Sequence, residues 1–118
     1  MSCGINTANT RLAPMAAGAT GTARDDQAIT GAGNVSRPTT IAMTVGAYAT
    51  LAVGPTYGIR VRFGSTTPTA VTTDTYFGPG TIYDWYVTNE TKMVAAIDVA
   101  GTAANTIEYH VWQSSPNP

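Results

Sequence analysis

The sequence predicts an all-β protein: a small β-sandwich or jelly-roll-like body of six to eight short antiparallel strands, preceded by an extended irregular N-terminal arm. Its 118 residues include 21 Thr, 18 Ala and 12 Gly but few Leu, Glu, Lys or Gln, so helix-favouring residues are scarce. Several segments alternate apolar and polar residues with a period of two, which is the strand signature. Glycine, proline and asparagine separate these segments at a spacing of about 8 to 12 residues, as in sandwiches and jelly rolls.

Residues 1–34 are predicted to form the arm. They include 18 Ala, Gly and Thr residues, and their few large apolar residues are widely spaced; all ten aromatic residues lie at Tyr48 or beyond. No helical or strand period is present. An arm of this length spans up to ~110 Å when fully extended. Because it cannot build a core, we expect it to become ordered only when it lies on another surface.

Residues 35–113 are predicted to form the folded body. The clearest strand covers residues 57–63, in which Tyr57, Ile59, Val61 and Phe63 share one face. The other expected strands, in chain order, are residues 40–45, 50–53, 69–73, 75–77, 81–87, 92–99 and 106–113.

The remaining residues, 114–118, contain two prolines and are expected to form a short tail, because proline cannot extend a strand ladder. A body of about 80 residues buries only about 60% of its unfolded surface, so its stability alone is marginal. Assembly into an oligomer or docking on a partner would add the missing burial.

Charge and composition exclude several classes of partner. Charged residues make up 11% of the chain, the net charge is -1 and the pI is about 5.6, so there is no basic field for nucleic acid. No apolar run reaches the ~18 residues of a membrane span, and we expect no secretion signal. Cys3 is the one cysteine, so no internal disulfide forms. We expect no nucleic-acid or membrane partner, and synthesis in a cytoplasm.

No residue pattern predicts catalysis, a metal site or a cofactor. The glycine-rich stretches in the arm lack the lysine and the preceding strand of a phosphate loop. Asp84, Asp98 and Glu108 fall on three strands that could be neighbours, and His110 shares a face with Glu108. Alternation, however, assigns the carboxylates of the body to the solvent face, and no compact metal-ligand spacing occurs. We therefore expect no enzyme.

The distinctive aromatic and arginine residues are better explained as contacts with a partner. Tyr86 and Trp112 fall on the strand faces opposite the core, where an exposed Tyr or Trp is an anchor for protein or sugar, unless loops or the arm cover that face. Arg60 and Arg62 lie on the outward face of the clearest strand. They could pair with carboxylates on a partner or on a neighbouring strand, or form an ordinary solvated face.

The arm carries a second set of expected partner contacts. Its sparse apolar residues would dock in apolar dimples of another subunit, and its charged residues would set the register by pairing. The apolar set is Leu12, Met15 and Ile29, and the charged set is Arg11, Arg24, Asp25 and Asp26.

Residues 57–112 resemble small virion proteins of tailed bacteriophages. The shared features are a strand with the sequence VRFG at residues 61–64, a Thr-rich middle and a Gly/Pro loop. A strand ending in a T…(V/L)AAI segment follows, here Thr91 and residues 94–97, and then a last short strand. The resemblance implies a β-sandwich that decorates or cements a virus particle. It leaves the choice between head, neck and tail open.

The expected function is therefore structural. The chain would be a virion protein of the capsid decoration or cement type, which binds the outer surface of a phage head and stabilises it. Its partners would be the major capsid protein or other virion proteins, and it would form a small homo-oligomer, a dimer or a trimer. The alternatives are a neck, tail or head-fibre component, and a host-surface glycan-binding module that stacks sugars on Tyr86 and Trp112.

Overall fold

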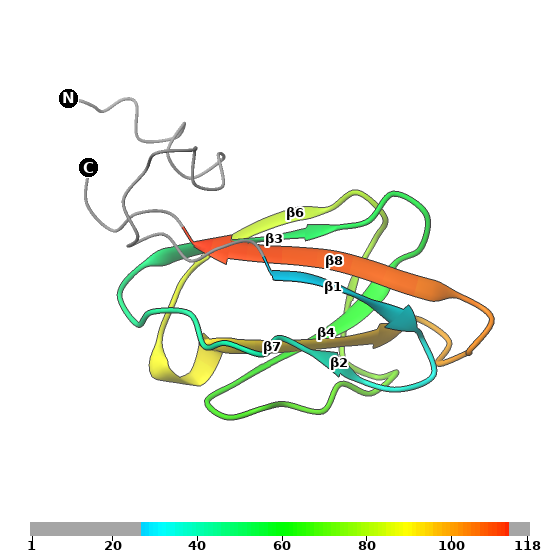
Figure 1. Ribbon diagram of the computed structural model, residues 1–118, viewed down its shortest axis with the longest axis horizontal. Coiled ribbons are helices and arrows are strands. Elements are labelled where there is room, and N and C mark those ends of the chain that lie inside the picture. Colours follow the sequence, from blue (N-terminus) through cyan, green and yellow to red (C-terminus); the bar gives the residue numbers. More distant parts are fainter. Residues whose placement is uncertain (1–26, 114–118) are drawn as a thin grey trace.

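A computed structural model of the protein describes residues 27–113, which form a β-sandwich of two four-stranded antiparallel sheets (Figure 1). The all-β prediction is confirmed. The elements are β1 (Gln27–Ala32), β2 (Arg37–Pro38), β3 (Tyr48–Val53), β4 (Ile59–Gly64), β5 (Thr75–Phe77), β6 (Ile82–Tyr86), the 3₁₀ turn η1 (Asn89–Thr91), β7 (Met93–Asp98) and β8 (Thr106–Gln113).

The strand order is that of an eight-stranded jelly roll. One sheet runs β1-β8-β3-β6 and the other runs β2-β7-β4-β5 (Figure 1). The chain is folded double, so that β1 pairs with β8, β2 with β7, β3 with β6 and β4 with β5. The doubled chain is then rolled, which also brings β8 beside β3 and β7 beside β4.

The core lies between the two sheets and is built by alternate residues of each strand. In β8, Ile107, Tyr109 and Val111 are fully buried, and in β4 Ile59 and Val61 are buried against them in the same cluster. Burying each such side chain favours folding by roughly 1.5–3 kcal/mol. The faces predicted for residues 81–87 and 106–113 are therefore the observed ones, and so is that of residues 57–63 except for Tyr57, which is exposed and precedes β4.

The other face of β7 is buried as well, by the long connection between β4 and β5. Ala70 of that connection packs against Ala95 and Ile97 of β7 in a small separate cluster. Residues 69–73, which were expected to form a weak strand, belong to this covering loop.

The predicted boundary between arm and body is wrong. Residues 27–32, assigned to the arm, form β1, which pairs along its whole length with β8. Ile29 lies opposite Tyr109 and packs against the core instead of remaining available for a partner. The small residues of β1 give little apolar pattern, and the neighbouring β8 supplies the ladder that makes this segment a strand.

The strand expected at residues 40–45 is absent. This segment crosses from β2 in one sheet to β3 in the other, so no neighbour pairs with it as a strand. Met43 is buried, whereas Ile41 and Val45 are 49% and 54% exposed. The alternating apolar residues of this segment therefore supply one core residue, Met43, and do not form a strand ladder.

The Tyr109 hydroxyl joins the two sheets. Tyr109 belongs to β8, and its Oη donates a hydrogen bond of 2.5 Å to the carbonyl oxygen of Arg37 in β2. Burial raises the pKa of Tyr109 well above its ordinary value, so the hydroxyl keeps its proton and remains a donor.

We expect Tyr109→Phe to lower the free energy of unfolding by about 1–3 kcal/mol, because the partly buried Arg37 carbonyl loses its hydrogen-bond partner. Denaturant titration measures this change. Tyr48→Phe is the matched control, because the Tyr48 side chain is 53% exposed, and it should leave stability unchanged. Equal stability of the two variants would show that the hydroxyl does not tie the sheets together.

Candidate interaction surface

The outer face of the β1-β8-β3-β6 sheet carries a pair of exposed tyrosines. Tyr48 of β3 and Tyr86 of β6 lie opposite each other in the ladder, and their rings meet edge to face at 5.4 Å. Tyr86 is 55% exposed, as its outward position predicts. Beside them, the Thr50 hydroxyl donates a hydrogen bond of 2.6 Å to the carboxylate of Asp84. The face thus combines aromatic rings with a carboxylate held in place.

Trp112 does not join this exposed pair. Alternation correctly places it on the outer face, opposite Thr50, but only 8% of its surface is exposed. Thr50 beside it is fully buried. The indole Nε1 is buried without a hydrogen-bond partner among residues 27–113. The expected role of Trp112 as an exposed stacking platform is therefore wrong, because position on a face does not decide what covers that face.

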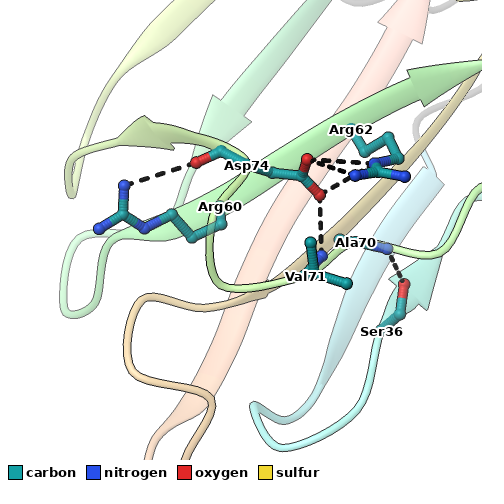
Figure 2. A network of polar contacts seen from close by, with 6 residues as sticks. All are labelled: Ser36, Arg60, Arg62, Ala70, Val71 and Asp74. Carbon is teal, nitrogen blue, oxygen red and sulfur yellow. Dashed lines mark hydrogen bonds and ion pairs between the residues drawn. The ribbon is translucent and has the colours of Figure 1, made fainter.

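Arg60 and Arg62 are engaged within the chain (Figure 2). The Arg62 guanidinium donates to both carboxylate oxygens of Asp74, with Nη2 at 2.9 Å from Oδ1 and Nε at 3.0 Å from Oδ2. Arg60 Nη1 lies 3.4 Å from the backbone carbonyl oxygen of Asp74, and its guanidinium lies 5.3 Å from the ring centroid of Tyr76. Arg62 thus pairs with a carboxylate of its own chain, whereas Arg60 contacts a backbone carbonyl and an aromatic ring.

These contacts hold the β4–β5 loop over the sheet. Asp74 Oδ2 accepts a hydrogen bond of 2.8 Å from the Val71 N–H, and Ser36 Oγ accepts one of 2.8 Å from the Ala70 N–H (Figure 2). Burial acts to raise the pKa of Asp74, but the hydrogen bonds from Arg62 and Val71 and the charge of Arg62 lower it below the usual value. The paired carboxylate therefore favours the closed loop at neutral pH.

The three carboxylates considered for a site do not converge. Asp84 on β6 and Glu108 on β8 stand on either side of β3, and Asp98 belongs to the other sheet. Glu108 lies beside His110, with 3.7 Å between Oε2 and Nε2, on the outer face of β8. Among residues 27–113 no group of three or more His, Cys, Asp or Glu side chains could hold a metal ion. The described part of the chain also has no helix long and apolar enough to cross a membrane.

Asp98 was expected on the solvent face, but it is 2% exposed. Its carboxylate accepts hydrogen bonds from the Ala100 N–H at 2.9 Å and the Asn105 amide at 3.0 Å. Gly33 lies directly against it, since a Cβ at residue 33 would be 2.3 Å from the Asp98 Cβ. Burial acts to raise the pKa of Asp98, but these hydrogen bonds lower it below the usual 3.8. Asp98 thus organises the turn that leads to β8.

We expect Asp98→Asn to lower the free energy of unfolding at neutral pH by about 1–3 kcal/mol, because an amide replaces a carboxylate that accepts several hydrogen bonds. A lowered native pKa means that this stabilisation is complete above the ordinary pKa and is lost as the pH falls through the native one. In thermal melts, the difference in melting temperature between wild type and Asp98→Asn should therefore shrink below pH 3.8.

The exposed Glu90→Gln is the control for this experiment and should leave stability unchanged at neutral pH. A gap between wild type and Asp98→Asn that stays constant down to the lowest measurable pH would contradict the assigned role of the charge.

Six of the expected partner contacts lie outside the described residues: Arg11, Leu12, Met15, Arg24, Asp25 and Asp26. Of the others, Tyr86 is exposed on a sheet face, Arg60 and Arg62 bind their own loop, and Ile29 and Trp112 are packed. Sequence reasoning missed Tyr48 as the neighbour of Tyr86. Tyr48 precedes the strand predicted at residues 50–53, and only the observed β3, which begins at Tyr48, and its register against β6 bring the two tyrosines together.

Comparisons of the chain with protein-family models, with curated proteins and with solved structures found no match.

Proposed function

We propose that this protein is a virion structural protein of the capsid decoration type, which binds the outer surface of a tailed-phage head and stabilises it. The observation that carries the proposal is the strand order, β1-β8-β3-β6 against β2-β7-β4-β5, which is the jelly-roll arrangement used by viral capsid domains. Since the same fold also serves unrelated functions, the surface must support the proposal as well.

The surface supports attachment to other proteins. Charged residues make up only 11% of the chain, and the net charge is -1, so repulsion between densely arrayed copies is small. The exposed tyrosine pair Tyr48 and Tyr86 provides the kind of rigid aromatic anchor that dominates protein interfaces. Many copies on a lattice then gain avidity from individually weak contacts.

Residues 1–26 supply the second element of the proposal. They precede β1, which is an edge strand of the sheet that carries the tyrosine pair. As an extended chain, 26 residues span up to about 85 Å. That reach is sufficient for contact with an adjacent subunit of a shell, where Leu12 and Met15 would be buried.

Deletion of residues 1–26 tests this use of the arm. The deletion stops before β1, whereas a longer one would remove a strand of the sandwich. We expect the shortened chain to keep its thermal melting temperature but to bind purified phage heads at least about tenfold more weakly, because the arm contacts are lost. Co-sedimentation with heads that lack the protein measures binding, and quantitation of the chain in purified particles distinguishes head from neck or tail. Unchanged binding would refute the arm contact, and absence from particles would refute the virion role.

A glycan-binding module is the second candidate, and the exposed Tyr48–Tyr86 pair is the observation that favours it. Aromatic rings offer faces on which sugars stack, and Asp84 lies on the same face to accept hydrogen bonds. If this is the function, Tyr86→Ala should abolish signals on a glycan array, while Tyr57→Ala, at an exposed tyrosine outside the pair, should retain them. No signal from the wild-type chain at about millimolar concentration would exclude this function.

A further inference from the structure

We propose that β6 is the edge at which two copies of this chain pair. In the proposed dimer the β6 strands run antiparallel about a two-fold axis and join the two β1-β8-β3-β6 sheets into one continuous eight-stranded sheet. The inference rests on the edges of the sandwich and does not depend on the proposed virion function.

Three of the four sheet edges in residues 27–113 are short or are covered at their ends. At β1, the Arg37 side chain donates a hydrogen bond of 3.0 Å to the Ala32 carbonyl, and the Gln27 side chain accepts bonds from the N–H groups of Thr40 and Ile41 at 3.0 and 3.1 Å. The edge β2 has two residues, one of them a proline, and the edge β5 has only three. Short edges, proline and covering segments are the means by which proteins prevent edge-to-edge pairing.

Within residues 27–113, the fourth edge, β6, has none of these protections. Its five residues, IYDWY, include no proline and no lysine. Hydrogen bonds from Val53 N–H to the Thr81 carbonyl and from Val87 N–H to the Ala47 carbonyl flank the β3–β6 ladder. In an antiparallel pair the bonded residues alternate, so the backbone groups of Ile82 and Tyr86 point away from β3 and toward the outer side. That side has the polarity and spacing required to accept another strand.

The apolar and aromatic side chains of β6 are also unusually exposed to solvent. Tyr83 faces the core, and its ring centroid lies 5.1 Å from that of Phe77 and 5.9 Å from that of Trp85. Tyr83 nevertheless remains 40% exposed. Ile82 and Tyr86, on the other face, are each 55% exposed. A strand added at β6 would cover side chains on both faces at once, which is the burial that a single copy lacks.

The area and the charge both fit a second copy. The exposed parts of Tyr48, Ile82, Tyr83 and Tyr86 amount to roughly 350 Å² per copy, if the second copy covers all of them. Counted on both copies and with the paired backbone, this reaches about the 1,000 Å² that a specific interface needs. A register centred on Trp85 places Asp84, the one charged residue of β6, opposite Tyr86 of the partner subunit, and so avoids a like-charge pair.

The edges also predict that assembly stops at two. In residues 27–113, β6 is the one edge that is neither short nor covered at its ends. It is complementary to itself under two-fold symmetry, so the contact closes and does not propagate into a filament. An interface of about 1,000 Å² lies at the small end of specific interfaces, where transient contacts are found.

Sedimentation of the full chain under reducing conditions, which keep Cys3 from linking copies, tests the proposal. We expect dimers that dissociate on dilution, and Ile82→Lys should raise the dissociation constant at least about tenfold, because a charged edge residue opposes strand pairing. Ile41→Lys is the matched control, since Ile41 is a similarly exposed isoleucine in a loop, and it should leave the constant unchanged.

Amide hydrogen exchange gives an independent test on the wild-type chain, so a variant that fails to fold does not leave the question open. The amides of Ile82 and Tyr86 should exchange more slowly at high protein concentration than at low concentration. A chain that stays monomeric, a dimer equally affected by both lysine variants, or a dimer in which these amides gain no protection would each overturn the proposal. The last two outcomes would point to another surface, including residues 1–26, as the dimer contact.

Discussion

The buried row of Ile107, Tyr109 and Val111 in β8 is the contact on which the rest of the structure depends. β8 pairs with β1 on one side and with β3 on the other, so its register determines which residues of both neighbours face the core. A shift of one residue would expose the whole row, which makes the register strongly specified. The hydroxyl of Tyr109 then reaches Arg37 in the opposite sheet, so one side chain contributes both apolar burial and a polar tie between the layers.

A second constraint is the cover over β7. Its six residues are all buried, which a half-exposed strand of a sandwich would not be. The β4–β5 loop provides this cover, and the bidentate contact between Arg62 and Asp74 holds the loop closed. An exposed ion pair adds little stability by itself. Its effect here is positional, because it keeps Ala70 against Ala95 and Ile97.

As a result of these two constraints, the outer faces of the two sheets are covered to different degrees. The outer face of the β2-β7-β4-β5 sheet is occupied over β7 by a segment of its own chain, whereas Tyr48, Ile82 and Tyr86 on the other sheet remain exposed. The proposed attachment to a shell and the proposed pairing of copies both draw on this second sheet, the first through its tyrosines and the second through its β6 edge. Tyr48 and Tyr86 belong to both, so the two proposed contacts share this small part of the surface.

The all-β class and the core faces of β4, β6 and β8 follow from the sequence alone. A strand places successive side chains on opposite faces, so the alternation around Ile59, Trp85 and Tyr109 is local information. Tertiary structure decided the rest, because cover and pairing come from residues distant along the chain. β1 is a strand because β8 lies beside it, Asp98 is buried because Gly33 and Asn105 lie against it, and Trp112 is buried although alternation assigns it to the outer face. Alternation specifies the face to which a side chain points, whereas only the folded chain determines whether that face is covered.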